Sequence, residues 1–310
     1  MKHHYWEAPI VIYLFLGGLG GGIFFLSALF DLIIAPGSGL LFFAPVFFAL
    51  AALALGCFFL VFELGQPPVF WRVFTTKTAI IKWGAVLLSV AMIFGFVWWA
   101  SYLYVLGWGW TFGLAAALEG VRPIMLGVAG VAGFGIMVYT GVMLSTLKAH
   151  AFWATPALPV LFTVSALSTA CAAIALSLGG AVDVNVIGAV VAELIHEIVH
   201  IVDIVLVVAE ITVLLIMVLS FYGKTAPLFW GGMVFGGLVL PLALYVLGAG
   251  STGSEVLAPI LVLCGGLLLR YLCVYSDERA PLPGEERFYE RLPKSDAKFL
   301  KAWTKGENLY

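Results

Sequence analysis

Residues 10–35 read IVIYLFLGGLGGGIFFLSALFDLIIA, a continuous apolar run long enough to cross a bilayer as one helix. Inside hydrocarbon, every backbone N–H and C=O needs a partner within the protein, so a polypeptide spans only as helices or as a closed barrel. Barrel strands alternate polar and apolar residues over about 10 positions. This run does not alternate, and it therefore predicts a transmembrane helix.

Runs of the same kind recur along the sequence. Of its 310 residues, 63% are hydrophobic and 10% are charged, and the mean hydropathy of +1.11 lies far above that of soluble domains. The sequence predicts an all-α membrane protein surrounded by lipid, with no nucleic-acid partner. We expect a transmembrane domain over 1–276 and a charged, solvent-exposed tail over 277–310. The eight expected spans are 10–35, 40–63, 79–104, 122–147, 156–179, 186–221, 227–249 and 256–276.

The distribution of basic residues predicts the topology. Eight spans place both termini on the same side of the membrane. By the positive-inside rule, the side with more lysine and arginine faces the cytoplasm. Outside the tail, the terminal side carries seven basic residues and the opposite side carries Arg122 alone, so we expect cytoplasmic termini. The seven are Lys2, Arg72, Lys77, Lys82, Lys148, Lys224 and Arg270.

The sixth span is unusually rich in ionisable residues, which are costly inside a membrane. At 100° per residue they fill a sector of roughly 140°, so this helix has one polar face. Such a row of histidines and carboxylates could pass protons. Hydrogen-bonded pairs that hold helices together would explain the same face equally well. The residues are Glu193, His196, Glu197, His200, Asp203 and Glu210.

The same span contains the H-E-x-x-H segment His196–His200. Both histidines fall on one helical face, as a zinc site needs, and Glu197 could act as a general base in an intramembrane metalloprotease. Zinc needs at least one more protein ligand, and no Asp-Gly segment follows in a later span. We therefore expect no metal site.

The remaining histidines and the cysteines do not predict a bound redox group. His3, His4 and His150 lie near span ends and offer no axial pair for a haem. No spacing among the cysteines fits an iron–sulphur cluster. They are Cys57, Cys171, Cys264 and Cys273.

A second polar group forms when the span ends on the terminal side are brought together. An apolar slot with one or two hydrogen-bond donors is what a quinone head group requires. Each of these residues taken alone is also an ordinary interfacial residue. They are Tyr13, Glu63, Gln66, Lys82 and Tyr139.

Seven motifs within roughly the first 170 residues resemble, in order and spacing, those of the NrfD/PsrC family, the membrane subunits of polysulphide-reductase-like complexes. The rest of the sequence is similar only in hydrophobic pattern and span count. The motifs are PIVIYLFLGGLGGG at 9–22, ELGQP at 63–67, FWR at 70–72, KWGA at 82–85, YTGVML at 139–144, FW at 152–153 and LPVLF at 158–162.

The resemblance implies two four-helix bundles with no haem or iron–sulphur cluster of their own. It implies quinone or quinol chemistry beside a docked ferredoxin-like iron–sulphur subunit, which passes electrons to or from a molybdopterin catalytic subunit. The family's quinone-contacting tyrosine corresponds to Tyr139, its first-helix site lies near Tyr13, and its carboxylate after the second helix corresponds to Glu63.

We therefore expect a quinone-reactive membrane anchor for anaerobic respiration in a prokaryotic cytoplasmic membrane, not catalytic alone. Glu63 and Tyr139 would form the proton-coupled site, and Tyr13 and Lys82 would support it. The alternative is a proton channel or secondary transporter that uses the polar face of the sixth span.

Overall fold

Eight helical segments of the computed structural model are long and apolar enough to cross a membrane. The described part of the protein is helical and has no β-strand, which confirms the predicted all-α membrane fold. The expected tail over 277–310 lies outside it. The structure describes residues 8–63, 72–75, 80–103, 113, 117–146, 153, 155–178, 186–217, 227–248 and 251–275.

Five spans are single helices: α4 (Ile80–Ala100), α6 (Arg122–Ser145), α7 (Ala157–Leu178), α8 (Val186–Met217) and α10 (Thr252–Val274). The other three combine two segments: α1 (Ala8–Leu29) with η1 (Phe30–Ile34), η2 (Gly39–Phe42) with α2 (Phe43–Glu63), and η7 (Leu228–Val239) with α9 (Leu240–Leu247). A short helix, α3 (Arg72–Thr75), precedes α4.

Most span ends lie within one or two residues of the prediction, but one end of α10 and one end of α4 differ from it by four residues. Helix α10 begins at Thr252, four residues before the expected position 256, because an acidic residue such as Glu255 is favourable in the first turn of a helix. Helix α4 ends at Ala100 rather than 104. There the Ser101 hydroxyl donates to the carbonyl oxygen of Trp98 at 2.6 Å.

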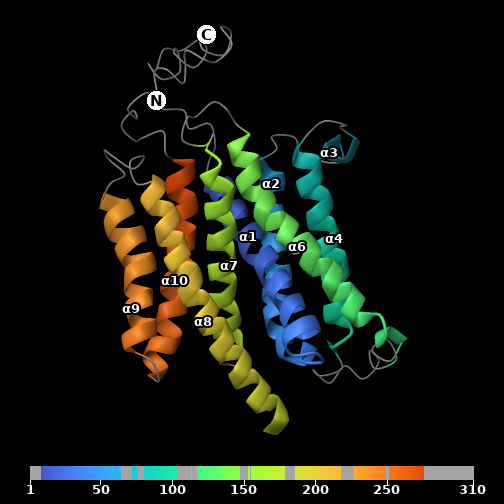
Figure 1. Cartoon of the computed structure of the whole chain (residues 1–310). Coiled ribbons are helices and arrows are strands. Elements are labelled where there is room, and N and C mark those ends of the chain that lie inside the picture. Colours follow the sequence, from blue (N-terminus) through green and yellow to red (C-terminus); the bar gives the residue numbers. More distant parts are fainter. Residues whose placement is uncertain are drawn as a thin grey trace.

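The spans form two four-helix bundles, as the resemblance implied. Helices α1, α2, α4 and α6 pack together, and α7, α8, α10 and the η7–α9 pair form the second group. Figure 1 shows the helices standing side by side, with the N-terminal end of α8 extending beyond its neighbours. Helix α1 packs on α2 and α6 of its own bundle and also on α7 and α10, so it lies between the two groups.

Glycines set the closest helix approaches. A Cβ added to Gly21 on α1 would lie 2.6 Å from the carbonyl oxygen of Gly133 on α6. In the second bundle, a Cβ added to Gly265 on α10 would lie 2.6 Å from the Cα of Gly237 on η7. Glycines within these apolar spans thus allow the helix backbones to approach closely.

One residue in the topology count needs correction. Arg270 was counted among the basic residues of the terminal side, but in the structure it lies on α10 with its side chain buried between helices, and 1% of its surface is exposed. It contacts α7 and α1 rather than the membrane surface. Without it, six basic residues against one still favour cytoplasmic termini.

Candidate functional site

The candidate quinone site begins with the packing of α1 against α6. The space beside Gly17 on α1 is bordered by Ile136 and Thr140 of α6, each 3.8 Å from an added Cβ. The two helices run in opposite directions. Tyr13 lies one turn from Gly17 toward the terminal side, and Tyr139 lies about one turn from Ile136 toward the same side, so the two phenols lie at a similar level. Both lie in one apolar core, with 4% and 8% of their surfaces exposed.

Helices α2 and α4 complete the surroundings of these phenols. The Tyr13 ring borders Gly56 of α2, whose added Cβ would lie 3.5 Å from a ring carbon. The Tyr139 ring covers Gly84 of α4, where an added Cβ would lie 2.7 Å from the hydroxyl oxygen and closer still to the ring. All four helices of the first bundle therefore meet at the level of the two tyrosines.

The hydroxyl of Tyr139 donates to the thioether sulphur of Met143 over 3.3 Å. A thioether is a weak acceptor, and a carbonyl oxygen is a much better one. The donor is buried and already oriented, and it can exchange its partner for a stronger one. This is the observation that makes the position fit a quinone carbonyl.

Two further predicted site residues, Lys82 and Glu63, lie between the two tyrosines in the sequence. Lys82 is half-buried on α4, two residues before Gly84. Glu63 is the last residue of α2. The placement of its side chain is not described, and Gln66 lies outside the described residues. The structure thus places Tyr13 and Tyr139 in one apolar core, whereas Lys82 lies on a different side of α4 from the contact between Gly84 and Tyr139.

A second polar site lies in the other bundle, around Asp203 of α8. The Asp203 carboxylate is buried and accepts hydrogen bonds from the hydroxyls of Ser168 on α7, at 2.6 Å, and Tyr245 on α9, at 2.7 Å. The His200 ring packs edge-on against Tyr245 with centroids 4.3 Å apart. Three spans thus converge on one carboxylate.

Two turns further along α8, Glu210 faces a buried arginine. The Arg270 guanidinium donates to the Ser165 hydroxyl at 2.6 Å and to the carbonyl oxygen of Gly266 at 2.9 Å. The buried Glu210 carboxylate interacts electrostatically with Arg270. The guanidinium lies over the ring of Phe15 on α1, at 5.8 Å, so this group reaches the boundary between the bundles.

The predicted polar face of α8 is therefore divided along its length. Asp203 and Glu210 are buried, His196 and His200 are half-buried, and Glu193 and Glu197 are exposed. The His196 and His200 rings lie 6.3 Å apart. Among the residues that the structure describes, no group of three or more His, Cys, Asp or Glu could hold a metal ion.

The family model described as "Polysulphide reductase, NrfD" matches residues 1–277. The protein belongs to this family. A protein named NrfD from Escherichia coli strain K12 is 30% identical over 186 residues, which cover 54% of the present sequence and 57% of that protein. A polysulfide reductase subunit from Wolinella succinogenes is 27% identical over 315 aligned positions, which cover 88% of the present sequence and 94% of that subunit.

Membership of the NrfD family, together with the eight spans, makes the protein a multi-pass membrane subunit of a respiratory complex. The family match extends over the second bundle, beyond the 170 residues in which the sequence motifs were recognised.

The sequence analysis did not identify four residues that belong to the second polar site of this NrfD-family protein: Ser165, Ser168, Tyr245 and Arg270. Isolated hydroxyls in apolar spans give little signal. Arg270 lies four residues before the end of α10, and a charge within a span, even in its last turns, indicates a possible buried partner.

Proposed function

We propose that this protein is the quinone-reactive membrane subunit of a respiratory oxidoreductase in a prokaryotic cytoplasmic membrane, with cytoplasmic termini. Its partner would be an extrinsic ferredoxin-like iron–sulphur subunit, which exchanges electrons with a molybdopterin catalytic subunit. The Wolinella succinogenes relative is by its name one part of a polysulfide reductase, which supports assembly with other subunits.

The buried hydroxyl of Tyr139 beside Tyr13, satisfied only by a thioether, carries this proposal. A quinone carbonyl oxygen would accept from Tyr139, and the second phenol provides another donor at the same level. Oxidation of a quinol releases two electrons and two protons. The electrons would pass to the iron–sulphur partner, and the protein would receive the protons.

Glu63 is the proposed proton acceptor because it ends α2 on the terminal side, where a carboxylate can exchange protons with water. Lys82 would support the site as a cationic group on α4. The protein's own chemistry is then binding and proton transfer, while the quinone and the partner's clusters change redox state.

The test is quinol-dependent reduction of the partner's clusters in the assembled complex. Tyr139→Phe keeps the ring over Gly84 and removes the donor, so we expect weaker quinol binding, by about 0.5–1.5 kcal/mol for a neutral hydrogen bond. Glu63→Gln should slow turnover more than it weakens binding. Wild-type kinetics in both variants, with the complex intact, would contradict the proposal.

A second candidate function rests on the buried groups of the other bundle. These groups follow one another across the membrane. Tyr245 and Asp203 lie nearer the side where α9 ends, and Glu210 and Arg270 lie nearer the side where α10 ends. We propose that α8 conducts protons along this series, with His196 and His200 and the exposed Glu193 and Glu197 leading to it. The distance of about 10.5 Å along α8 between Asp203 and Glu210 would need water or side-chain motion.

Proton uptake into proteoliposomes distinguishes this candidate from an anchor. If α8 conducts, Asp203→Asn should abolish quinol-driven uptake while cluster reduction continues. If the subunit is an anchor alone, wild type and variant should give the same proton signal.

A further inference from the structure

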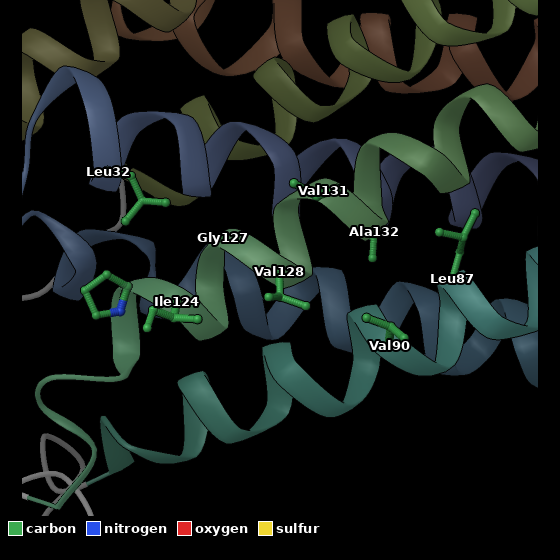
Figure 2. Close-up of a pocket in the computed structure, with 9 residues that line it drawn as sticks. Leu32, Leu87, Val90, Ile124, Gly127, Val128, Val131 and Ala132 are labelled. Atoms are coloured by element: carbon green, nitrogen blue, oxygen red, sulfur yellow. The ribbon is translucent and has the colours of Figure 1, made fainter.

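An apolar groove lies between α4 and α6. Its volume is about 620 Å³. Figure 2 shows Val90 of α4 and Val128 of α6 directed into the space between these two helices. The lining is entirely apolar and consists of Leu32, Leu87, Val90, Pro123, Ile124, Gly127, Val128, Val131 and Ala132.

The inner end of the groove adjoins the candidate quinone site. Leu87 lines the groove and packs against the apolar core that contains Tyr139. It is one helical turn from Gly84, which the Tyr139 ring covers, and it borders Gly135, one turn from Tyr139 on α6. The groove therefore begins about one helical turn beyond the contact between Tyr139 and α4, between the same two helices.

The outer part of the groove opens to the surroundings of the bundle. Val131 and Ile124 are 75% and 63% exposed, on a surface where lipid would lie. The groove ends at Pro123 and at Leu32 of η1, on the side opposite the termini. From Gly135 to Pro123, α6 rises by about 18 Å. The groove thus follows the bilayer depth from the tyrosines toward the other membrane surface.

We propose that this groove binds the isoprenoid tail of the quinone whose head group lies at Tyr13 and Tyr139. The inference rests on the proposed function and extends it to a second part of the ligand. An isoprenoid tail has no polar atoms, and the lining offers it none. Continuity with Leu87 favours this occupant over a phospholipid acyl group, because a tail attached to a head group at Tyr139 must begin at this inner end of the groove.

The experiment compares two quinols in the assembled complex, one with a long isoprenoid tail and one with none. Val128→Trp and Gly127→Leu each fill the groove from α6. An added Cβ at Gly127 meets only the end of the flexible Leu32 side chain, at 3.3 Å, so this second substitution is tolerated by the packing. Ile93→Trp is the matched control, because Ile93 is 61% exposed on α4 and does not line the groove.

For the long-tailed quinol we expect both groove variants to raise KM by roughly tenfold, the order expected when one or two apolar groups lose their burial. KM for the quinol without a tail should stay at the wild-type value, and Ile93→Trp should change neither. A quinone with a photoreactive group on its tail should label the peptide that contains Val128.

Unchanged KM for the long-tailed quinol in both groove variants would overturn the inference, as would equal losses for the two quinols. Loss of a bound phospholipid from the variants with unchanged quinol kinetics would assign the groove to lipid instead. The proposed function is tested separately, because Tyr139→Phe should weaken both quinols. If it weakens neither, the head-group site fails, whatever the groove variants show.

Discussion

The ring of Tyr139 on α6 occupies the space that Gly84 on α4 leaves by lacking a side chain. No larger residue at position 84 is compatible with this arrangement of the ring without movement of one helix. The pair therefore fixes both the separation of α4 and α6 and the position of the Tyr139 hydroxyl.

We predict that Gly84→Ala displaces the Tyr139 ring and impairs quinol oxidation. Overpacking of this kind costs about 1–3 kcal/mol of folding stability. Gly231→Ala is the matched control, since an added Cβ there has nothing within 4 Å. Gly84→Ala should unfold at a lower temperature in detergent and reduce the partner's clusters more slowly with quinol than Gly231→Ala does. Equal unfolding temperatures and equal rates in the two variants would show that Tyr139 can move freely.

Removal of Arg270 should destabilise the second bundle. Arg270→Met removes the hydrogen bonds of the guanidinium to Ser165 and Gly266 and the cation that interacts with the buried Glu210 carboxylate. Buried polar groups left without a partner cost about 1–3 kcal/mol each. The double variant Arg270→Met with Glu210→Leu should recover much of this loss, because neither charge remains. The free energies of unfolding of the two single variants and the double variant give the coupling between the two residues, and additive losses would contradict their electrostatic interaction.

The topology predicts the outcome of reporter fusions. A reporter after Tyr310 should lie in the cytoplasm, and one inserted at Ser251, directly before α10, should lie outside. Activity of a periplasm-dependent and a cytoplasm-dependent reporter at each position checks this. The reverse pattern would mean that the six basic residues of the terminal side do not set the orientation.

The H-E-x-x-H segment should not bind zinc. Two histidine ligands are too few for a protein zinc site, and the His200 ring already packs against Tyr245. Purified protein should contain no stoichiometric zinc, and His200→Gln should not change the metal content. About one zinc per protein molecule, lost in that variant, would restore the metalloprotease interpretation.

The spans followed from the sequence because apolar length determines them directly. The shared level of Tyr13 and Tyr139 also followed, since both lie about two turns from the terminal ends of their helices. The contact between Tyr139 and Gly84 did not. It depends on how closely α4 approaches α6, and the hydrophobic periodicity of a sequence does not predict the distance between two helices.

The second bundle was less predictable. Helical periodicity correctly grouped Asp203 and Glu210 on one face of α8, but it could not show that Glu193 is exposed while Glu210 is buried. That difference depends on which neighbouring helices cover each turn of α8. Arg270 was misplaced for a related reason, because its position near the end of α10 resembles that of a loop charge.

The contacts of α1 with α10 also have a consequence for biosynthesis. Phe15 and Gly18 on the first span contact Arg270 on the last one, so more than 250 residues separate the partners in the sequence. A ribosome delivers the spans in order, and closing so long a loop is entropically costly. The first helix to be synthesised therefore stays incompletely packed in the bilayer until the eighth has been inserted.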